Sequence, residues 1–239
     1  MSNILNAIGL SLVGYLALVV VSHTFSAVVP VMGFYIRMLI AYTCLVLCAS
    51  IGVFSSIFLR LIGYQRISQW FVGRCFKYTM WYTTGITFTI DDPHDYLSKT
   101  RPAIFVGNHQ TELDVLMLGC IFPKWCSVTA KRSLKNLPFL GWFMTLSGTV
   151  FIDRANSKNA RQAMAGASDE ISREKQSVYM FPEGTRSYTK EPTLLPFKKG
   201  AFHLAIQSGV PIVPVVVANY SHILHPRTLT FKSGEIPIR

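Results

Sequence analysis

Acidic residues are scarce in this chain and are missing from its first third. Of the 239 residues, 12 are Asp or Glu and 23 are Lys or Arg, which gives a formal net charge of +11, and the first acidic residue is Asp91. Such an excess of positive charge favours anionic partners, either nucleic acid or a lipid surface. No DNA- or RNA-reading motif accompanies the charge. We therefore expect an anionic lipid surface or anionic substrates, and no nucleic acid.

Cysteines at metal-site or redox spacing are also missing. Cys44, Cys48, Cys75, Cys120 and Cys126 form no Cys-x-x-Cys motif and have no His partners at metal spacing. We expect no metal site, and nothing indicates an oxidising compartment. The sequence contains no internal repeat and no low-complexity tract.

Charge is almost absent from the first 59 residues, where Arg37 is the only Lys, Arg, Asp or Glu. The whole chain is 50% hydrophobic with a mean hydropathy of +0.35, and the excess lies in this front part. Two apolar stretches, Ile4–Val21 and Met38–Leu59, are each near the ~20 residues that cross a bilayer core. A cleaved signal peptide fits poorly, because no basic segment precedes the first stretch and a second one follows. We predict a membrane helical hairpin over residues 1–62, either spanning or re-entrant.

Cations and aromatic residues alternate over residues 63–84, directly after the hairpin. The set comprises Arg66, Trp70, Phe71, Arg74, Phe76, Lys77, Tyr78, Trp81 and Tyr82. This mixture is typical of a helix at the lipid headgroups, and the positive-inside rule places this side of the membrane in the cytoplasm. The alternative is an ordinary basic helix that packs on the globular part.

Residues 85–239 alternate between strand patterns and helix patterns. The predicted strands are Gly85–Ile90, Ala103–Val106, Cys126–Ala130, Thr149–Ile152, Val178–Phe181 and Ile212–Val217. The predicted helices are Glu112–Phe122, a broken or short helix over Lys135–Ser147, Lys158–Glu174, and Gly200–Gln207, which Gly209 would terminate. This alternation predicts an α/β domain with αβα layers and a largely parallel or mixed sheet. Phe231–Arg239 reads as one more strand with nothing covering it, so we expect the natural protein to continue beyond Arg239.

His109 and Asp114 stand five residues apart just after the predicted strand Ala103–Val106. Positions i and i+5 do not face each other on a helix. The two side chains can meet only if His109 lies in the turn and Asp114 reaches back from the first helical turn. A carboxylate in that position would orient the imidazole and leave its other nitrogen free to take a proton. On spacing alone, a polar helix start without chemistry is the alternative.

Cations and hydroxyl groups follow three further predicted strands. They are Lys131, Arg154 and the run Glu183-Gly184-Thr185-Arg186. Because the carboxyl ends of parallel strands meet at one edge of a sheet, we expect these residues to surround one pocket together with His109. Gly184 permits close backbone approach, and Arg186 offers a planar fork suited to phosphate. The pattern favours a phosphate-bearing substrate whose hydroxyl is deprotonated. The alternative is a charged loop in which Glu183 pairs with Arg186.

Four segments resemble, in family order, the motifs of the glycerolipid acyltransferases (PlsC-like). Asn108-His109 through Asp114 resembles the His-x4-Asp motif, and Phe181–Arg186 resembles the phosphate-binding motif. Phe151–Arg154 and Val210–Pro214 are similar to the two remaining blocks. Within the family, Lys131–Phe143 and Leu195–Leu204 are most similar to fungal 1-acyl-sn-glycerol-3-phosphate acyltransferases.

That resemblance implies acyl transfer from acyl-CoA to the sn-2 hydroxyl of lysophosphatidic acid, which gives phosphatidic acid. It implies an integral protein of the endoplasmic reticulum membrane with its site at the cytoplasmic interface. His109 would be the general base and Asp114 its orienting carboxylate. Lys131, or backbone amides near it, would stabilise the oxyanion, while Arg154 and the run Glu183–Arg186 would bind the substrate's glycerol phosphate. No cofactor is implied beyond acyl-CoA as co-substrate, and no obligate protein partner.

One position departs from the family pattern. Thr111-Glu112 stands where Ser followed by an apolar residue is common, so Glu112 adds a carboxylate inside the first motif. Four other activities also stay open. They are transfer to glycerol 3-phosphate or another lysophospholipid, CoA-free transfer between lipids, hydrolysis by the same His–Asp pair, and non-catalytic binding of anionic lipid.

Overall fold

The computed structural model describes residues 2–153 and 157–239. Its helices are α1 (Ser2–Val28), α2 (Pro30–Leu61), α3 (Ser68–Thr84), α4 (Tyr96–Lys99), α5 (Asp114–Ile121), α6 (Leu140–Leu146), α7 (Ser157–Glu174) and α8 (Gly200–Ser208). Short 3-10 helices are η1 (Gln65–Ile67), η2 (Arg132–Asn136) and η3 (Pro226–Thr228). Its strands are β1 (Ile86–Ile90), β2 (Ile104–Gly107), β3 (Cys126–Lys131), β4 (Val150–Ile152), β5 (Ser177–Met180), β6 (Ile212–Val215), β7 (Leu224–His225), β8 (Thr230–Phe231) and β9 (Gly234–Ile238).

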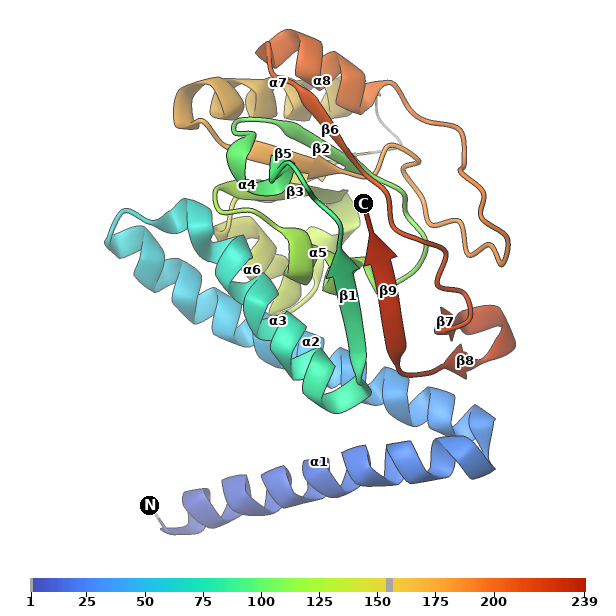
Figure 1. Cartoon of the computed structure of the whole chain (residues 1–239). Coiled ribbons are helices and arrows are strands. Elements are labelled where there is room, and N and C mark those ends of the chain that lie inside the picture. Colours follow the sequence, from blue (N-terminus) through green and yellow to red (C-terminus); the bar gives the residue numbers. More distant parts are fainter. Residues whose placement is uncertain (1, 154–156) are drawn as a thin grey trace.

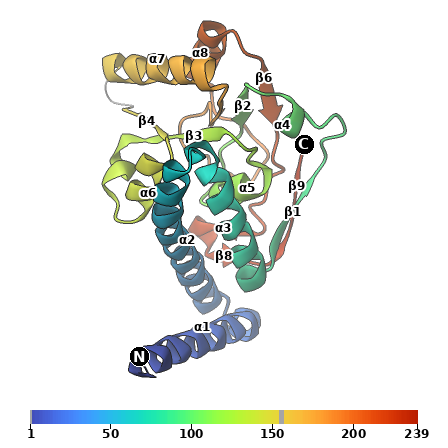
Figure 2. The same ribbon diagram turned by 90° about the vertical axis from the view of Figure 1, so that its left-hand side faces the viewer.

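The two apolar stretches lie in α1 and α2, which meet at Val29 and contact each other. The Tyr15 hydroxyl of α1 lies 3.1 Å from the sulfur of Cys44 in α2. Figures 1 and 2 show α1 away from the sheet, beside the first part of α2. Among the described residues, α2 is the one helix whose length and hydropathy would let it cross a bilayer, whereas the apolar part of α1, Leu5–Val21, is shorter.

The central sheet has five strands among the described residues, in the order β4-β3-β5-β2-β6. Every pair of neighbours runs parallel, which confirms the predicted parallel sheet. The carboxyl ends of β2, β3, β5 and β6 therefore lie at the same edge (Figure 1). This edge carries the segments singled out from the sequence.

Helices cover both faces of this sheet, as the predicted αβα layers require. Side chains alternate between the faces, because successive residues of a strand point to opposite sides. Ile104 of β2 and Val178 of β5 pack with the residues of α7 and α8. Phe105 of β2 and Tyr179 of β5 belong to the larger core with α2, α3 and α5. Figure 2 shows α7 and α8 together on one side and α3 with α5 on the other.

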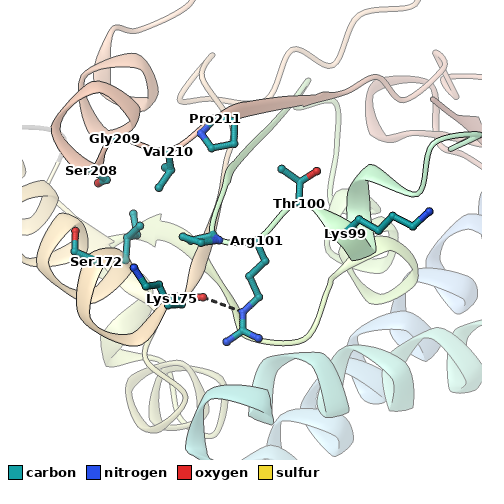
Figure 3. Close-up of a pocket in the computed structure, with 11 residues that line it drawn as sticks. Lys99, Thr100, Arg101, Ser172, Lys175, Ser208, Gly209, Val210 and Pro211 are labelled. Atoms are coloured by element: carbon teal, nitrogen blue, oxygen red, sulfur yellow. Dashed lines mark hydrogen bonds between the residues drawn. The ribbon is translucent and has the colours of Figure 1, made fainter.

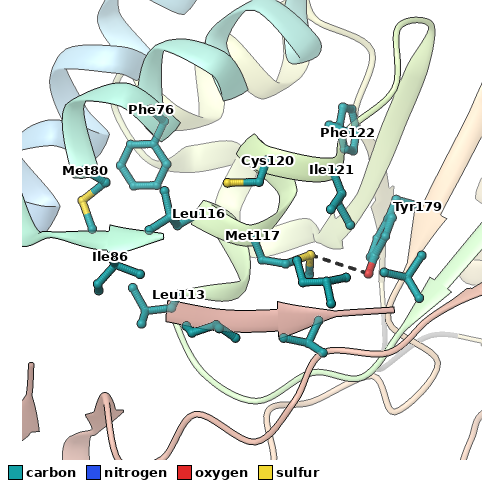
Figure 4. Packing of buried hydrophobic residues seen from close by; sticks show 14 of the residues in the cluster. Phe76, Met80, Ile86, Leu113, Leu116, Met117, Cys120, Ile121, Phe122 and Tyr179 are labelled. Carbon is teal, nitrogen blue, oxygen red and sulfur yellow. Dashed lines mark hydrogen bonds between the residues drawn. The ribbon is translucent and has the colours of Figure 1, made fainter. Parts of the chain in front are cut away.

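The larger core fixes α5, whose first turn carries Asp114. Leu116 and Met117 of α5 are fully buried. Leu116 lies beside Phe76 of α3, and Met117 extends toward Tyr179 of β5 (Figure 4). The Tyr179 hydroxyl donates to the sulfur of Met117 at 3.9 Å, which ties α5 to β5. The helix α5 is therefore held by packing against both α3 and β5. This packing fixes the position of Asp114 in its first turn.

Two strand predictions need correction. Phe231–Arg239 is not an uncovered strand: β9 pairs in parallel with β1, from Ile86 with Gly234 to Ile90 with Ile238. Ile236 and Ile238 are buried, so β9 has its own apolar layer. The periodicity of the block with Pro211 and Pro214 predicts a buried strand, but β6 is an edge strand of the sheet. Its Val213 and Val215 are buried, and Pro214 between them is exposed.

Two of the basic residues in and before α3, Arg66 and Arg74, bond to the globular part of the protein. Arg66 forms an ion pair with Glu170 at 2.8 Å and donates to Gln176 at 2.6 Å. Arg74 donates to the carbonyls of Gly119 and Cys120 at the end of α5, where free carbonyls need a donor. These two cations thus bond within the globular part, as the alternative interpretation of this segment requires. Exposed aromatic side chains remain beside them: Phe71, Tyr78, Trp81 and Tyr82.

Candidate active site

The turn after β2 brings His109 and Asp114 together. The helix α5 begins at Asp114 rather than at the predicted Glu112, because the Asp114 and Val115 amides donate to the carbonyls of Thr111 and Glu112. His109 therefore lies in the turn and Asp114 in the first helical turn, as their spacing requires. His109 Nδ1 lies 2.6 Å from Asp114 Oδ2.

The Asp114 carboxylate is fully buried and saturated with donors. Its Oδ2 also accepts from the amides of Gln110 at 2.6 Å and Thr111 at 3.2 Å, and its Oδ1 accepts from the Tyr220 hydroxyl at 2.6 Å. Each of these contacts brings a donor to a carboxylate oxygen. A hydrogen on His109 Nδ1 completes this set of donors, which leaves the lone pair of the imidazole on Nε2.

His109 Nε2 makes no hydrogen bond to any residue that the structure describes, and the His109 side chain is 15% exposed. The imidazole stacks on Phe181 with 4.1 Å between ring centroids and 20° between planes. The ring is thus held on one face and at one nitrogen. This is the geometry of a positioned general base.

Glu183 supports the turn through the backbone rather than facing open space. It is buried, and its two oxygens accept from the amides of His109 at 2.7 Å and Leu195 at 3.0 Å. We expected Glu183 to bind substrate. In the structure both of its carboxylate oxygens instead accept hydrogen bonds from the protein backbone. A buried carboxylate that clamps two loops explains why Glu is needed here.

Gly184 follows with a φ of +69°, in the left-handed region that favours glycine. A Cβ at this position would lie 2.9 Å from Lys198 Nζ, so a cation lies directly over the loop. Thr185 is exposed. Backbone turns with adjacent cations suit oxyanions, which agrees with the predicted phosphate site.

Arg186 pairs with Glu112, not with Glu183. Arg186 Nη1 donates to Glu112 Oε1 at 2.7 Å and to the Tyr188 hydroxyl at 3.1 Å. Burial lowers the pKa of Arg186, but the hydrogen bond to Tyr188 and the charge of Glu112 outweigh it and raise the pKa above its ordinary value. Arg186 is therefore permanently charged, and its side chain is 38% exposed at the same edge as His109.

The structure does not place the other two predicted cations, Lys131 and Arg154, beside His109. Lys131 ends β3, is exposed and makes no polar contact with any described residue. In the sheet order, β5 lies between β3 and β2, so Lys131 starts about 10 Å from the end of β2 at ordinary strand spacing. Arg154 lies outside the described residues.

Sequence reasoning missed the roles of Tyr220 and Tyr188. Tyr220 follows β6, the neighbour of β2, so the sheet-edge argument used for the other residues could have included it. Burial, followed by the charge of Asp114, raises the pKa of Tyr220 well above its usual value. Its hydroxyl stays protonated and donates to Asp114.

Two other features carry no comparable chemistry. A cavity of about 550 Å³ lies at the opposite ends of the strands, with Lys99, Arg101 and Lys175 in its lining. Figure 3 shows Lys99 and Arg101 extending in different directions, so their charges do not converge. No group of three or more His, Cys, Asp or Glu side chains that could hold a metal occurs among the described residues.

The comparisons with known proteins match the part of the chain that contains this site. Residues 90–218 match the family model described as Acyltransferase. The chain is 45% identical over 206 residues to the 1-acyl-sn-glycerol-3-phosphate acyltransferase of Saccharomyces cerevisiae, covering 86% of this chain and 67% of that protein. It is 40% identical over 180 residues to 1-acyl-sn-glycerol-3-phosphate acyltransferase beta of Homo sapiens, covering 75% and 62%.

A solved structure shares the fold. It is the 1-acyl-sn-glycerophosphate (LPA) acyltransferase PlsC from Thermotoga maritima, with a TM-score of 0.62, 23% identity, and coverage of 95% of this chain and 83% of that chain. The matched residues 90–218 contain β2 to β6 and both loops that meet at His109. The family model thus covers the residues that build the candidate site, and this chain belongs to the acyltransferase family.

Proposed function

We propose that this chain transfers an acyl group from acyl-CoA to the sn-2 hydroxyl of 1-acyl-sn-glycerol 3-phosphate and so forms phosphatidic acid. The observation that carries the proposal is the 2.6 Å contact between His109 Nδ1 and the buried Asp114 carboxylate, with Nε2 left unbonded among the described residues. The names of the yeast and human relatives supply the substrate.

In the proposed step, the acceptor oxygen attacks the thioester carbonyl carbon while His109 Nε2 takes its proton. The tetrahedral intermediate then collapses, the C–S bond breaks, and the CoA sulfur leaves with the proton from the imidazolium. General base catalysis of this kind contributes about 10²–10⁴-fold in rate. The hydroxyl is itself the nucleophile, so no enzyme thiol is needed. In agreement, burial raises the pKa of Cys120 to about 11, which keeps that thiol protonated at neutral pH.

The acceptor's phosphate would bind at the loop of Gly184, Thr185 and Arg186. Arg186 is charged and partly exposed, and Lys198 lies over Gly184. A phosphate monoester carries about −1.5 to −2 charges at pH 7, so two cations match it. We assign oxyanion stabilisation to Lys131 or nearby backbone amides, and we include Arg154 in the phosphate site as a sequence-based assignment. No cofactor beyond acyl-CoA is required by this scheme.

We further propose that the protein is integral to the endoplasmic reticulum membrane, with the site at the cytoplasmic interface. The apolar helix α2 and the exposed aromatic side chains of α3 support attachment to a bilayer. Both lipids would then present their reactive groups at the depth of the sheet edge.

The test is an assay of the full chain with labelled oleoyl-CoA and a panel of acceptors: lysophosphatidic acid, glycerol 3-phosphate, a lysophosphatidylcholine, and none. We expect labelled phosphatidic acid with lysophosphatidic acid, and loss of about 10²–10⁴-fold in His109→Ala while that variant still unfolds cooperatively and stays bound to the membrane. Near-normal turnover by His109→Ala would refute the base assignment.

Other arms of the same assay separate the alternatives. Labelled free fatty acid without acceptor would indicate a hydrolase, and label in another acceptor would replace the substrate. Labelled lipid formed from a labelled donor lipid without CoA would indicate CoA-free transfer. Binding to anionic vesicles without turnover would indicate a scaffold. Abolition by a chelator and recovery with a divalent ion would contradict a cofactor-free reaction.

A further inference from the structure

Arg186 is held by only one of its three side-chain nitrogens. Both of its hydrogen bonds come from Nη1, one to Glu112 and one to Tyr188. Nε and Nη2 make no hydrogen bond to any described residue. The side chain as a whole is 38% exposed, and the Nε–Nη2 edge is the part of the guanidinium without a partner among the described residues. That edge is one of the two faces by which Arg binds a phosphate or carboxylate bidentately.

Glu112, Tyr188 and Arg186 close a triangle of hydrogen bonds. Glu112 Oε1 accepts from Arg186 Nη1 at 2.7 Å and from the Tyr188 hydroxyl at 2.6 Å. Burial, then the hydrogen bond to Glu112, raises the pKa of Tyr188 above its ordinary value, so its hydroxyl stays a donor. A guanidinium fixed at Nη1 by two partners has little freedom to turn.

The other oxygen of Glu112 shows that this triangle is not arranged for stability alone. Glu112 Oε2 is buried and has no hydrogen-bond partner among the residues that the structure describes. An unsatisfied buried acceptor destabilises the fold, and such groups are unusual enough to need a reason. Holding Arg186 in one orientation supplies that reason.

Glu112 also stands inside the catalytic turn, between His109 and Asp114. Two main-chain bonds join this turn to the loop of Arg186, from the Ser187 amide to the His109 carbonyl at 2.9 Å and from the Tyr188 amide to the Gln110 carbonyl at 3.2 Å. The base and the guanidinium are therefore fixed relative to each other. A fixed separation favours acceptors whose phosphate lies at a set distance from the reacting hydroxyl.

We propose that Glu112 is a positioning residue that, together with Tyr188, holds Arg186 by Nη1 and presents its Nε–Nη2 edge to the phosphate of the acceptor. This inference rests on the proposed function, because it requires a phosphorylated acceptor. It gives a role to the carboxylate that departs from the family pattern.

The test is steady-state kinetics of the full chain with lysophosphatidic acid and oleoyl-CoA varied separately. Glu112→Ala should raise the KM for lysophosphatidic acid about tenfold, as expected for one charge-assisted hydrogen bond. Its kcat should stay within about threefold and its KM for acyl-CoA should not change. Glu112→Gln keeps an acceptor oxygen for Nη1, so its KM for lysophosphatidic acid should return to within about threefold of wild type or fall below it.

Two further variants keep the test sharp. Tyr188→Phe removes only one hydroxyl and should raise the same KM about threefold, which tests the triangle even if Glu112→Ala folds poorly. Glu170→Ala is the matched control, because it breaks the 2.8 Å pair with Arg66 far from the site. It should leave all three constants unchanged.

Each remaining outcome counts against the proposal. An unchanged KM in Glu112→Ala would remove the positioning role, and a lowered KM would make Glu112 a competitor of the phosphate. Equal loss in Glu112→Ala and Glu112→Gln would tie the effect to charge rather than to the hydrogen bond. A wild-type enzyme that ignores phosphorylated acceptors would refute the proposed function, and this inference with it.

Discussion

The Asp114 carboxylate depends on a single side chain outside its own turn. Three of its contacts come from residues 109–111, and the fourth is the Tyr220 hydroxyl at 2.6 Å. The same hydroxyl lies 3.0 Å from Thr111 Oγ1 and accepts from the Thr111 amide at 3.1 Å. Tyr220 thus braces both the carboxylate and the turn that carries it.

Tyr220→Phe should therefore destabilise the protein and slow it. The change leaves the buried Asp114 Oδ1 without a donor, which costs about 1–3 kcal/mol of unfolding free energy, and we expect kcat to fall several-fold because Asp114 is held less firmly. Thermal unfolding and turnover measure the two effects. Tyr179→Phe is the control, since that equally buried hydroxyl makes, among the described residues, one weak hydrogen bond, to Met117 Sδ at 3.9 Å; equal effects of the two variants would contradict the bracing role.

The raised pKa of Tyr220 also fixes the sign of a pH effect. In the unfolded chain tyrosine titrates near pH 10, and in the folded chain the pKa is higher because of burial and then Asp114. The stabilising contribution of this group is fully present below about pH 10 and is lost as the pH rises through the folded pKa. Wild-type stability should therefore fall above about pH 10 more steeply than that of Tyr220→Phe.

Sequence spacing was sufficient for residues that belong to one turn. His109, Asp114 and Arg186 could be chosen because they lie in segments that follow strand patterns. The same argument could have included Tyr220, but it could not have named the contacts of Tyr220 and Tyr188, which depend on how the loops after β5 and β6 fold across the edge. The Glu112–Arg186 pair joins two loops 74 positions apart, and no local pattern contains that information.

At the scale of elements, α3 and α5 approach closely enough for their backbones to touch. A Cβ on Gly119 of α5 would lie 2.5 Å from the carbonyl oxygen of Gly73 in α3. A main-chain atom cannot turn aside as a side chain can. This contact sets the position of the helix that begins at Asp114.

Gly119→Ala should lower the unfolding free energy by about 1–3 kcal/mol, the usual cost of overpacking. Activity per folded molecule should also fall, because α5 must shift. Gly166→Ala is the matched control in α7, where nothing lies within 4 Å of an added Cβ. That variant should gain about 0.5–1 kcal/mol from helix propensity. Chemical denaturation of both variants gives the comparison, and equal signs would be inconsistent with the packing argument.

The periodicity of the sequence predicted β1 to β6 within a few residues, and the alternation of strands and helices predicted the parallel pairing in the central sheet. It did not predict that β6 is an edge strand or that β9 pairs with β1. A β-branched run reads the same in a central strand and in an edge strand, so the pattern of Ile212–Val217 does not reveal that β6 lies at the edge of the sheet. Likewise β9 needs β1, a partner about 150 residues away, and a pattern within one segment cannot name its partner.

At the scale of the whole molecule, Arg37 joins the apolar hairpin to the α/β part. It is buried in α2 and donates to the Thr84 carbonyl at the end of α3 at 2.8 Å and to Ser233 Oγ before β9 at 3.2 Å. A charged residue in an otherwise apolar stretch thus faces the protein. These bonds fix the position of α2 relative to the end of α3 and the start of β9.

Arg37→Met keeps the apolar stem and removes both bonds. Each hydrogen bond from a charged donor contributes about 1.5–3 kcal/mol, so losing two of them corresponds to a fall of roughly 6–24 °C in Tm for a chain of this size. Thermal unfolding in detergent measures this shift. Arg60→Met, at the exposed end of α2 with no partner among the described residues, should leave Tm unchanged, and a similar loss there would mean that the charge rather than the bonds matters.

The pairing of β1 with β9 has a consequence for how the protein is made. At synthesis rates of about 5–20 residues per second, the roughly 150 residues between these strands take about 7–30 s to appear. Throughout that interval β1 has emerged but has no partner, and its buried Ile86 lacks the layer that Ile236 and Ile238 complete. Each nascent chain therefore passes through a stage with an open strand edge, and we expect chaperones to bind it during that stage.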